Sequence, residues 1–223
     1  MTLRTFVLLE DTLPRAAHPV YLPGGRRALY VRTGSVGVGD ETGSQFLWAG
    51  SALVQQGEAT LQPGEDDAVV WRWELADDDS YGPEHFALRS APQTTTEVKL
   101  VTTVDLDDRY TWLMRCDTVA FPPGGAALTH LHQGPGIRIT LDGEITIETE
   151  GTRSVYRAGE AWAEKGVLPV YAPTWEQAPT EFVRCFLLPK HNKGVSSLRI
   201  VDEADQALPN TQKYRVLSER VLT

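Results

Sequence analysis

The sequence has few cysteines and no long apolar run. Its 223 residues include only Cys116 and Cys185, each inside an apolar stretch, which is typical of buried thiols in a reducing compartment. No apolar run approaches the roughly 18 to 20 residues that span a bilayer. The opening stretch MTLRTFVLLEDTLPR is interrupted by Glu10 and Asp11, which does not fit a signal peptide. We therefore expect a cytoplasmic protein.

Positive charge is also scarce. The chain carries 21 Lys and Arg against 30 Asp and Glu, which gives a formal net charge of −9. A nucleic acid or an anionic membrane needs a basic surface that replaces its counterions. We therefore expect a small-molecule partner, and neither nucleic acid nor membrane.

Helical periodicity is rare, and short apolar or alternating runs take its place. Examples are AVVWRWEL, IRITLDGEITIET and EFVRCFLLP, and Gly, Pro and Asp separate such runs. This rhythm is typical of an all-β sandwich or barrel. The pair Asp142-Gly143 between two runs predicts a tight hairpin turn.

The chain repeats itself. One constant shift aligns AGSALVQQG with AGEAWAEKG and brings three glycine pairs together: Gly34 with Gly143, Gly50 with Gly159, and Gly57 with Gly166. Each such glycine marks a turn that few backbone angles satisfy, so the coincidence indicates duplication. We predict two copies of one β domain, at 1–90 and 95–190. An extension at 191–223 would wrap the core or contact a partner subunit.

The stretch THLHQGPGIRITLDGE lies in the second copy. Gly124 is followed by five residues, then by His130-x-His132, and Gly143 closes the pattern. This spacing resembles the first motif of the cupin superfamily, and the duplication makes the chain similar to a bicupin. The resemblance implies an all-β fold of two tandem jelly-roll barrels, also called double-stranded β-helices. It implies a dioxygenase, decarboxylase, isomerase or lyase, without a choice among them.

The chain departs from the family pattern at the metal ligands. Gly136 stands where family members place a metal-binding glutamate, and Pro169 stands at the histidine position of the second motif. Glu164 occupies the proline position of that motif. Two of the usual four ligands remain, His130 and His132. In the first copy Tyr21 and Pro23 replace both histidines, so we interpret that copy as structural.

Strand alternation places several polar side chains inside the second barrel. His130 and His132 share one strand face, and Arg138 continues that face beyond Gly136. A buried guanidinium requires an ionic partner or a bound anion, and Glu164 is the nearest candidate partner. The candidates for substrate binding are Arg138, Arg184, Trp162 and Gln133. The alternatives are an ion-pair network that only fixes the barrel, a solvated position on a sheet edge for Arg184, and core packing for Trp162.

A metal site is the first interpretation of the histidine pair. Glu164 would complete a set of two histidines and one carboxylate, suited to Fe, Mn, Ni or Zn. A metal-free pair of histidines at a barrel mouth fits the sequence as well.

These residues predict an enzyme that acts on a small organic acid or an enolisable substrate. Arg138 would hold a carboxylate, while His130, His132 and Glu164 would hold the metal or act as catalytic groups. In a metal-free variant a histidine acts as general base, and Arg138 is a catalytic group that stabilises the developing oxyanion. The alternative is a non-catalytic module that binds a small anion, as a sensor, carrier or scaffold. We also expect a homodimer.

Overall fold

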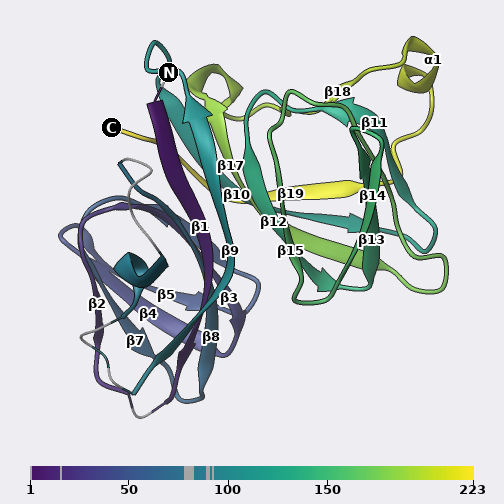
Figure 1. Cartoon of the computed structure of the whole chain (residues 1–223). Coiled ribbons are helices and arrows are strands. Elements are labelled where there is room, and N and C mark those ends of the chain that lie inside the picture. Colours follow the sequence, from purple (N-terminus) through teal and green to yellow (C-terminus); the bar gives the residue numbers. More distant parts are fainter. Residues whose placement is uncertain (1, 16, 78–82, 89–90, 92) are drawn as a thin grey trace. The chain divides into compact units, whose positions relative to one another are not determined.

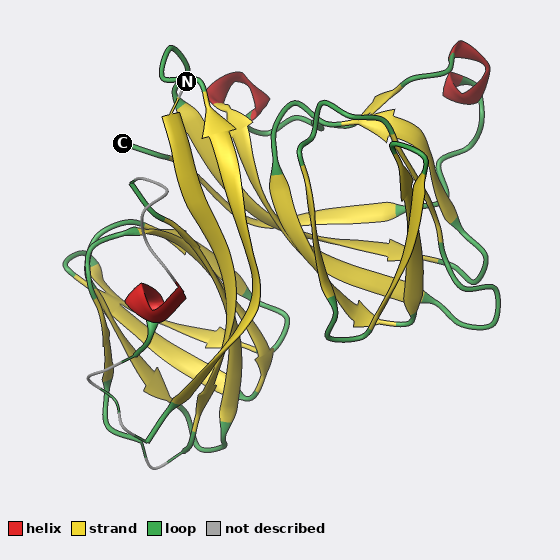
Figure 2. Cartoon of the chain, viewed as in Figure 1, coloured by secondary structure: helices red, strands yellow, loops and turns green. Residues whose placement is uncertain are grey.

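The computed structural model describes residues 2–15, 17–77, 83–88, 91 and 93–223. The contacts divide the chain into two compact units, the first ending at Arg109 and the second beginning at Tyr110 (Figure 1). Strands dominate both units, and the helical segments are short (Figure 2). Among the described residues no helix is long and apolar enough to cross a membrane. The all-β prediction is confirmed.

The first unit consists of two antiparallel sheets. One has the order β6-β3-β8-β1-β9, with β1 Thr2–Leu13, β3 Arg26–Thr33, β6 Ala52–Gln55, β8 Ala68–Leu75 and β9 Thr95–Leu106. The other has the order β2-β7-β4-β5, with β2 Val20–Leu22, β4 Ser35–Asp40, β5 Gly43–Trp48 and β7 Ala59–Pro63. A 3₁₀ turn, η1, covers Pro83–Phe86.

The second unit repeats this plan. Its first sheet has the order β15-β12-β17-β10-β19, with β10 Trp112–Phe121, β12 Gly136–Asp142, β15 Ala161–Glu164, β17 Thr180–Pro189 and β19 Lys213–Val221. Its second sheet has the order β14-β13-β16-β11-β18, with β11 Ala126–Leu131, β13 Glu144–Thr149, β14 Thr152–Arg157, β16 Val170–Pro173 and β18 Arg199–Ile200. The 3₁₀ turn η2 Lys190–Asn192 and the helix α1 Glu203–Gln206 lie between β17 and β19.

The matching strand orders show the duplication in three dimensions. The repeated glycines also share their backbone conformation, since φ is 71° at Gly34 and 77° at Gly143. At both positions the chain passes from one sheet to the other, because β3 and β4, like β12 and β13, belong to different sheets. The predicted hairpin at Asp142-Gly143 is therefore wrong. The turn is the corner of a jelly roll, and a left-handed glycine makes it.

The unit boundaries differ from those expected from the sequence. Residues 95–109 were assigned to the second copy, but β9 pairs along β1 in the first unit. The expected extension at 191–223 contributes strands to the second barrel: β18 pairs with β11 at His130, and β19 pairs with β10. In the first barrel β9 lies next to β1, and in the second β19 lies next to β10. Both of these strands come after the repeated part of the sequence.

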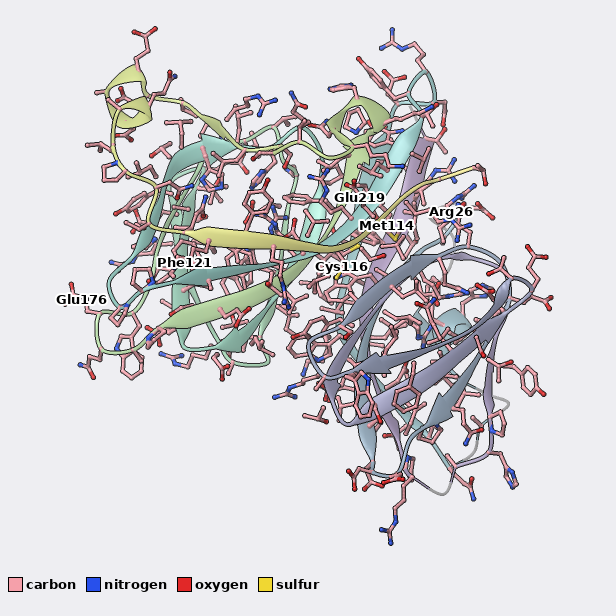
Figure 3. The ribbon with its side chains drawn as sticks, turned by 180° about the vertical axis from the view of Figure 1, so that it is seen from behind. Arg26, Met114, Cys116, Phe121, Glu176 and Glu219 are labelled. Atoms are coloured by element: carbon pink, nitrogen blue, oxygen red, sulfur yellow. The ribbon has the colours of Figure 1, made fainter. Side chains whose placement is uncertain are left out.

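Each barrel has its own apolar core. In the second, inward side chains from both sheets pack together: Val119, Phe121, Ala127, Ile145, Ile147, Trp162, Val170, Ala172 and Phe182. Along β10 the inward residues alternate with outward ones, so Phe121 belongs to this core whereas Met114 and Cys116 take the other face (Figure 3). Both faces of this strand are buried. The apolar runs of the sequence reflect burial on two sides.

The two cysteines are direct cross-strand partners on β10 and β17. Both are free and fully buried, and burial raises the pKa of each thiol well above its ordinary value. A buried, protonated thiol is unreactive. This agrees with the expectation of buried free thiols.

Candidate functional site

The histidine pair lies inside the second barrel. His130 belongs to β11 and His132 follows it, and strand alternation turns both rings inward, with their centroids 4.8 Å apart. His130 Nδ1 lies 2.7 Å from the carbonyl oxygen of Leu128. Because a carbonyl oxygen can only accept, Nδ1 carries the hydrogen, and Nε2 of the neutral ring keeps a free lone pair.

His132 is held by the segment that follows η2. Ser197 Oγ lies 3.2 Å from His132 Nδ1, and the His132 ring meets the Phe186 ring edge-on at 4.7 Å. Burial lowers the pKa of both histidines, and the cations Arg184 and Arg138 lower the pKa of His132 further. Both imidazoles are therefore neutral near pH 7 and available as bases.

Two guanidinium groups lie next to each other in the same interior. Arg138 on β12 and Arg184 on β17 are direct cross-strand partners. Their Cζ atoms lie 4.8 and 4.5 Å from the centre of the Phe186 ring. Both side chains are buried, where adjacent like charges repel each other unless anions compensate them. Burial lowers the pKa of Arg138 to about 10, so it stays charged at neutral pH.

Each arginine has one acidic neighbour. Arg184 Nε donates to Asp117 Oδ1 at 2.6 Å, and Arg138 Nη1 donates to the carbonyl oxygen of Gly136 at 2.6 Å. Arg138 Nη2 lies 2.7 Å from Glu164 Oε2, but no hydrogen bond joins them, so the contact is an ion pair alone. Glu164 Oε1 accepts from Trp162 Nε1 at 2.8 Å.

Three buried polar atoms of this cluster lack a hydrogen-bonding partner. They are Arg138 Nη2, Glu164 Oε2 and Asp117 Oδ2. Burial raises the pKa of Asp117, and the guanidinium of Arg184 opposes that rise. Buried polar atoms in folded proteins are nearly always paired, with protein or with water. Arg138 Nη2 and Glu164 Oε2 face each other in an ion pair, so Asp117 Oδ2 alone of the three atoms lacks a polar contact of this kind.

These side chains surround a small interior cavity. The centre of a water molecule can move within a volume of about 10 Å³ there, so the cavity has room for about one water. One wall carries charged and aromatic groups, and the other is apolar, formed by Ala127, Ala172, Ile145 and Ile147. Gln212, just before β19, also lines the cavity. The cavity thus has a polar side and a hydrocarbon side.

The first barrel has a polar interior of a different kind. Arg27 Nε donates to Glu74 at 2.8 Å, and Arg72 donates to Asp11 at 2.6 Å and to Glu74 at 2.8 Å. Every nitrogen of both guanidinium groups has an acceptor, among them Gln55 and the carbonyl oxygens of residues 23, 57 and 86. A network in which both guanidinium groups are saturated fixes the barrel, although Gln55 Nε2 has no hydrogen-bonding partner. It supports the interpretation of the first copy as structural.

Comparison with known proteins rests on structure alone. No protein-family model matches the sequence, and no curated protein matches it. Oxalate decarboxylase from Lactobacillus farciminis, solved as a formate complex, matches with a TM-score of 0.64 at 11% identity, over 92% of this chain and 82% of that one. A variant of Bacillus subtilis oxalate decarboxylase matches with a TM-score of 0.61 at 13% identity, over 91% and 74%. The chain has a bicupin fold.

A third match extends the comparison beyond oxalate decarboxylases. AerE from Microcystis aeruginosa has a TM-score of 0.59 at 11% identity, over 82% of this chain and 88% of that one. At such identities the likeness shows the fold and not the activity. The prediction of two tandem cupin barrels is confirmed, and the function has to be argued from the second barrel itself.

The structure brings together most of the residues that the sequence singled out. His130, His132, Arg138, Glu164, Trp162 and Arg184 all line the cavity of the second cupin barrel. Gln133 does not, because it follows His132 and points to the other side of the chain. Its Oε1 lies 3.2 Å from His191 Nε2 at an exposed position. The prediction that Gln133 binds substrate does not fit this placement.

The first-copy counterparts of the histidines were also misplaced. Tyr21 is 65% exposed, and Val20 and Leu22 take the inward positions of β2. In the ladders Val20 opposes Leu61 as His130 opposes Val170. The constant shift of the repeat is therefore off by one residue in this strand, where β11 has an irregular register.

Sequence reasoning missed Asp117 and Ser197. Asp117 stands in WLMRCDTVAF, where Arg115 and Asp117 interrupt an apolar run, and charged residues in such a run were a signal for interior ion pairs. Ser197 lies in a polar segment with no recognisable pattern, and only the pairing of β18 with β11 brings it to His132.

The proposed metal ligands do not form a metal centre. Within the described ranges no group of three or more His, Cys, Asp or Glu side chains is placed to hold a metal. A Cβ on Gly136 would lie 3.1 Å from Arg138 Nη1 and 2.8 Å from the Phe186 ring. The guanidinium of Arg138 thus occupies the space of the missing glutamate. Its positive charge opposes a cation there, and Glu164 faces that guanidinium, so the residues do not fit a bound metal.

Proposed function

We propose that the second cupin barrel is an enzyme that binds a small organic carboxylate and transfers a proton on it without a metal. The observation that carries the proposal is the buried cross-strand pair of Arg138 and Arg184 beside two neutral histidines. Two buried guanidinium groups, each beside a single carboxylate, are suited to an anion that replaces one of these carboxylates. A neutral imidazole beside it is suited to proton transfer.

The proposal gives each group a role that its contacts support. Arg138 Nη2, which has no hydrogen-bonding partner, would donate to the ligand carboxylate. His130 would accept a proton at Nε2, because its Nδ1 is committed to Leu128. The guanidinium of Arg138 or Arg184 would then stabilise the enolate oxygen that forms. The substrate would be a 2-oxo acid or another enolisable acid.

The apolar wall limits the rest of the ligand. Ala127 and Ala172 are paired across β11 and β16, and both line the cavity with small side chains. A short hydrocarbon group would lie there. The oxalate decarboxylases of similar fold, as their name states, act on a small carboxylate, which is consistent with this class of ligand.

A carrier or sensor of small anions is the second candidate. The small cavity, with room for about one water, favours it, because a ligand must first displace side chains. The two candidates differ in the fate of the ligand. An enzyme of this type exchanges the proton next to the carbonyl group, whereas a carrier binds the acid unchanged.

Proton exchange in D₂O separates the two functions. We would incubate the whole chain with pyruvate and 2-oxobutyrate and follow the loss of the C3 proton signals by NMR. The expected result is exchange above the buffer rate, reduced about 100-fold or more in His130→Gln with binding retained. His191→Gln, which changes an exposed histidine, is the matched control. Binding without exchange in the unmodified protein would establish the carrier, and neither binding nor exchange would refute both candidates.

A further inference from the structure

Glu164 already occupies the position that a ligand carboxylate requires. Its Oε2 lies 2.7 Å from Arg138 Nη2, a buried nitrogen without a hydrogen bond. The cavity has room for about one water. A second carboxylate therefore cannot reach Arg138 while Glu164 stays in place.

The contact between Glu164 and Arg138 is suited to replacement. Arg138 is anchored separately, through Nη1 to the carbonyl oxygen of Gly136 and by its stacking on Phe186. Glu164 is held at its other oxygen by Trp162 Nε1. It is also the last residue of β15, and its side chain is more exposed than that of Arg138, 8% against 1%. Arg138 can stay fixed while the carboxylate beside it changes.

We propose that Glu164 is an internal competitor, a resident carboxylate that the ligand displaces from Arg138. The inference rests on the proposed function, because it presupposes that the barrel binds an anion. Two carboxylates at one guanidinium repel each other strongly in a buried site. Glu164 therefore weakens the binding of every carboxylate and favours ligands that engage both arginines. This makes it a residue that determines specificity.

The first barrel shows that an uncharged side chain fits this strand position. Gln55 opposes Arg27 in the ladder of β3 and β6, as Glu164 opposes Gly136 in the ladder of β12 and β15. Its Oε1 accepts from Arg27 Nη1 at 2.7 Å, so an amide at this place satisfies a guanidinium without a negative charge. Glu164→Gln is thus expected to fold, and it removes the competitor.

The test is calorimetric titration of the whole chain with formate, acetate, propionate and pyruvate at fixed pH and ionic strength. Glu164→Gln is expected to bind the best of these acids at least about tenfold more tightly than the unmodified protein. Glu160→Gln is the matched control, because it removes the same charge at an exposed position four residues away. Acetamide serves as the neutral probe, and its binding is expected to be weak and equal in all three proteins.

The possible failures are distinguishable. If the unmodified protein binds an acid and Glu164→Gln binds it equally or more weakly, the competitor role is refuted, and the anion site remains. If no variant binds any of the four acids, the proposed function fails together with the inference. Glu164→Ala repeats the titration with the carboxylate removed in another way. It decides the question if Glu164→Gln does not fold.

Discussion

Arg138 and Arg184 are direct partners across β12 and β17, and their guanidinium groups both lie over the ring of Phe186. In the first barrel the corresponding pair is Leu29 and Arg72. Arg184 thus has a counterpart in the first barrel, Arg72, and each of the two pairs with an aspartate, Asp117 or Asp11. Arg138 has no such counterpart and occurs in the barrel that contains the histidines. The additional cation, and not the common one, distinguishes the candidate site from the structural network.

The pair Arg138 and Glu164 can be exchanged for its first-barrel counterparts. Arg138→Leu combined with Glu164→Gln reproduces Leu29 and Gln55, which oppose Leu53 and Arg27 on the neighbouring strands. Replacing a buried ion pair by uncharged groups is often neutral or stabilising by about 1–4 kcal/mol. We therefore expect unchanged or increased stability in urea unfolding, and complete loss of carboxylate binding.

The single variant Arg138→Leu is the comparison for this double variant. It leaves the buried carboxylate of Glu164 without its cation, so we expect it to lose about 3 kcal/mol of unfolding free energy. If the double variant is destabilised as much as the single one, Arg138 serves the barrel and not a ligand.

The buried histidines predict an acid-sensitive fold. The pKa of His130 and of His132 is lowered in the folded protein. Below pH 6.5 the unfolded chain therefore binds protons at these histidines more readily than the folded chain does. The free energy of unfolding should therefore fall as the pH decreases below about 6.5, by up to about 1.4 kcal/mol per pH unit for each histidine. Asp117 affects stability in the opposite direction, because its pKa is raised in the folded protein. Its contribution to the free energy of unfolding is lost as the pH rises above 3.8.

Urea unfolding at several pH values measures this dependence. The variant His130→Gln with His132→Gln should flatten the curve below about pH 6.5. An equally steep curve in that variant would assign the acid sensitivity to other groups.

The two thiols offer a simple test of the burial of β10 and β17. Because Cys116 and Cys185 are fully buried and the pKa of each is raised, neither should react with a thiol reagent in the native state. Both should react once the protein is unfolded in urea. Fast reaction of one thiol in the native protein would show that this part of the sheet opens.

The fold could be predicted from the sequence because the glycine turns are local signals, and because the same turns recur in both copies of the repeat. Gly34 and Gly143 need a left-handed conformation wherever the chain changes sheets, and a pattern of this kind survives sequence divergence. Strand alternation likewise predicted that Arg138 shares the interior of His130. The hairpin at Gly143 was wrong because the same turn residues serve hairpins and corners, and only long-range pairing separates the two.

The ligand set was harder to predict because it depends on contacts between distant segments. Glu164 was expected beside Arg138, and it lies there. Its role as the partner of Arg138 depends on the guanidinium that fills the space beside Gly136. The spacing of residues in the sequence does not reveal that placement. Asp117 and Ser197 reach the site through strand pairing over long sequence separations.

Metal content is the measurement that most directly tests the proposed chemistry. Protein purified without chelator and without affinity metal should contain well below one metal ion per chain by elemental analysis. The reason is electrostatic: Arg138 occupies the position of the missing glutamate, and both arginines lie beside the imidazoles that would bind the ion. A content near one Fe, Mn, Ni or Zn per chain, lost in His130→Ala with His132→Ala, would instead establish a metal centre. Glu164 would then have to leave Arg138 to become the third ligand, and dioxygenase, isomerase and lyase assays would replace the proton-exchange experiment.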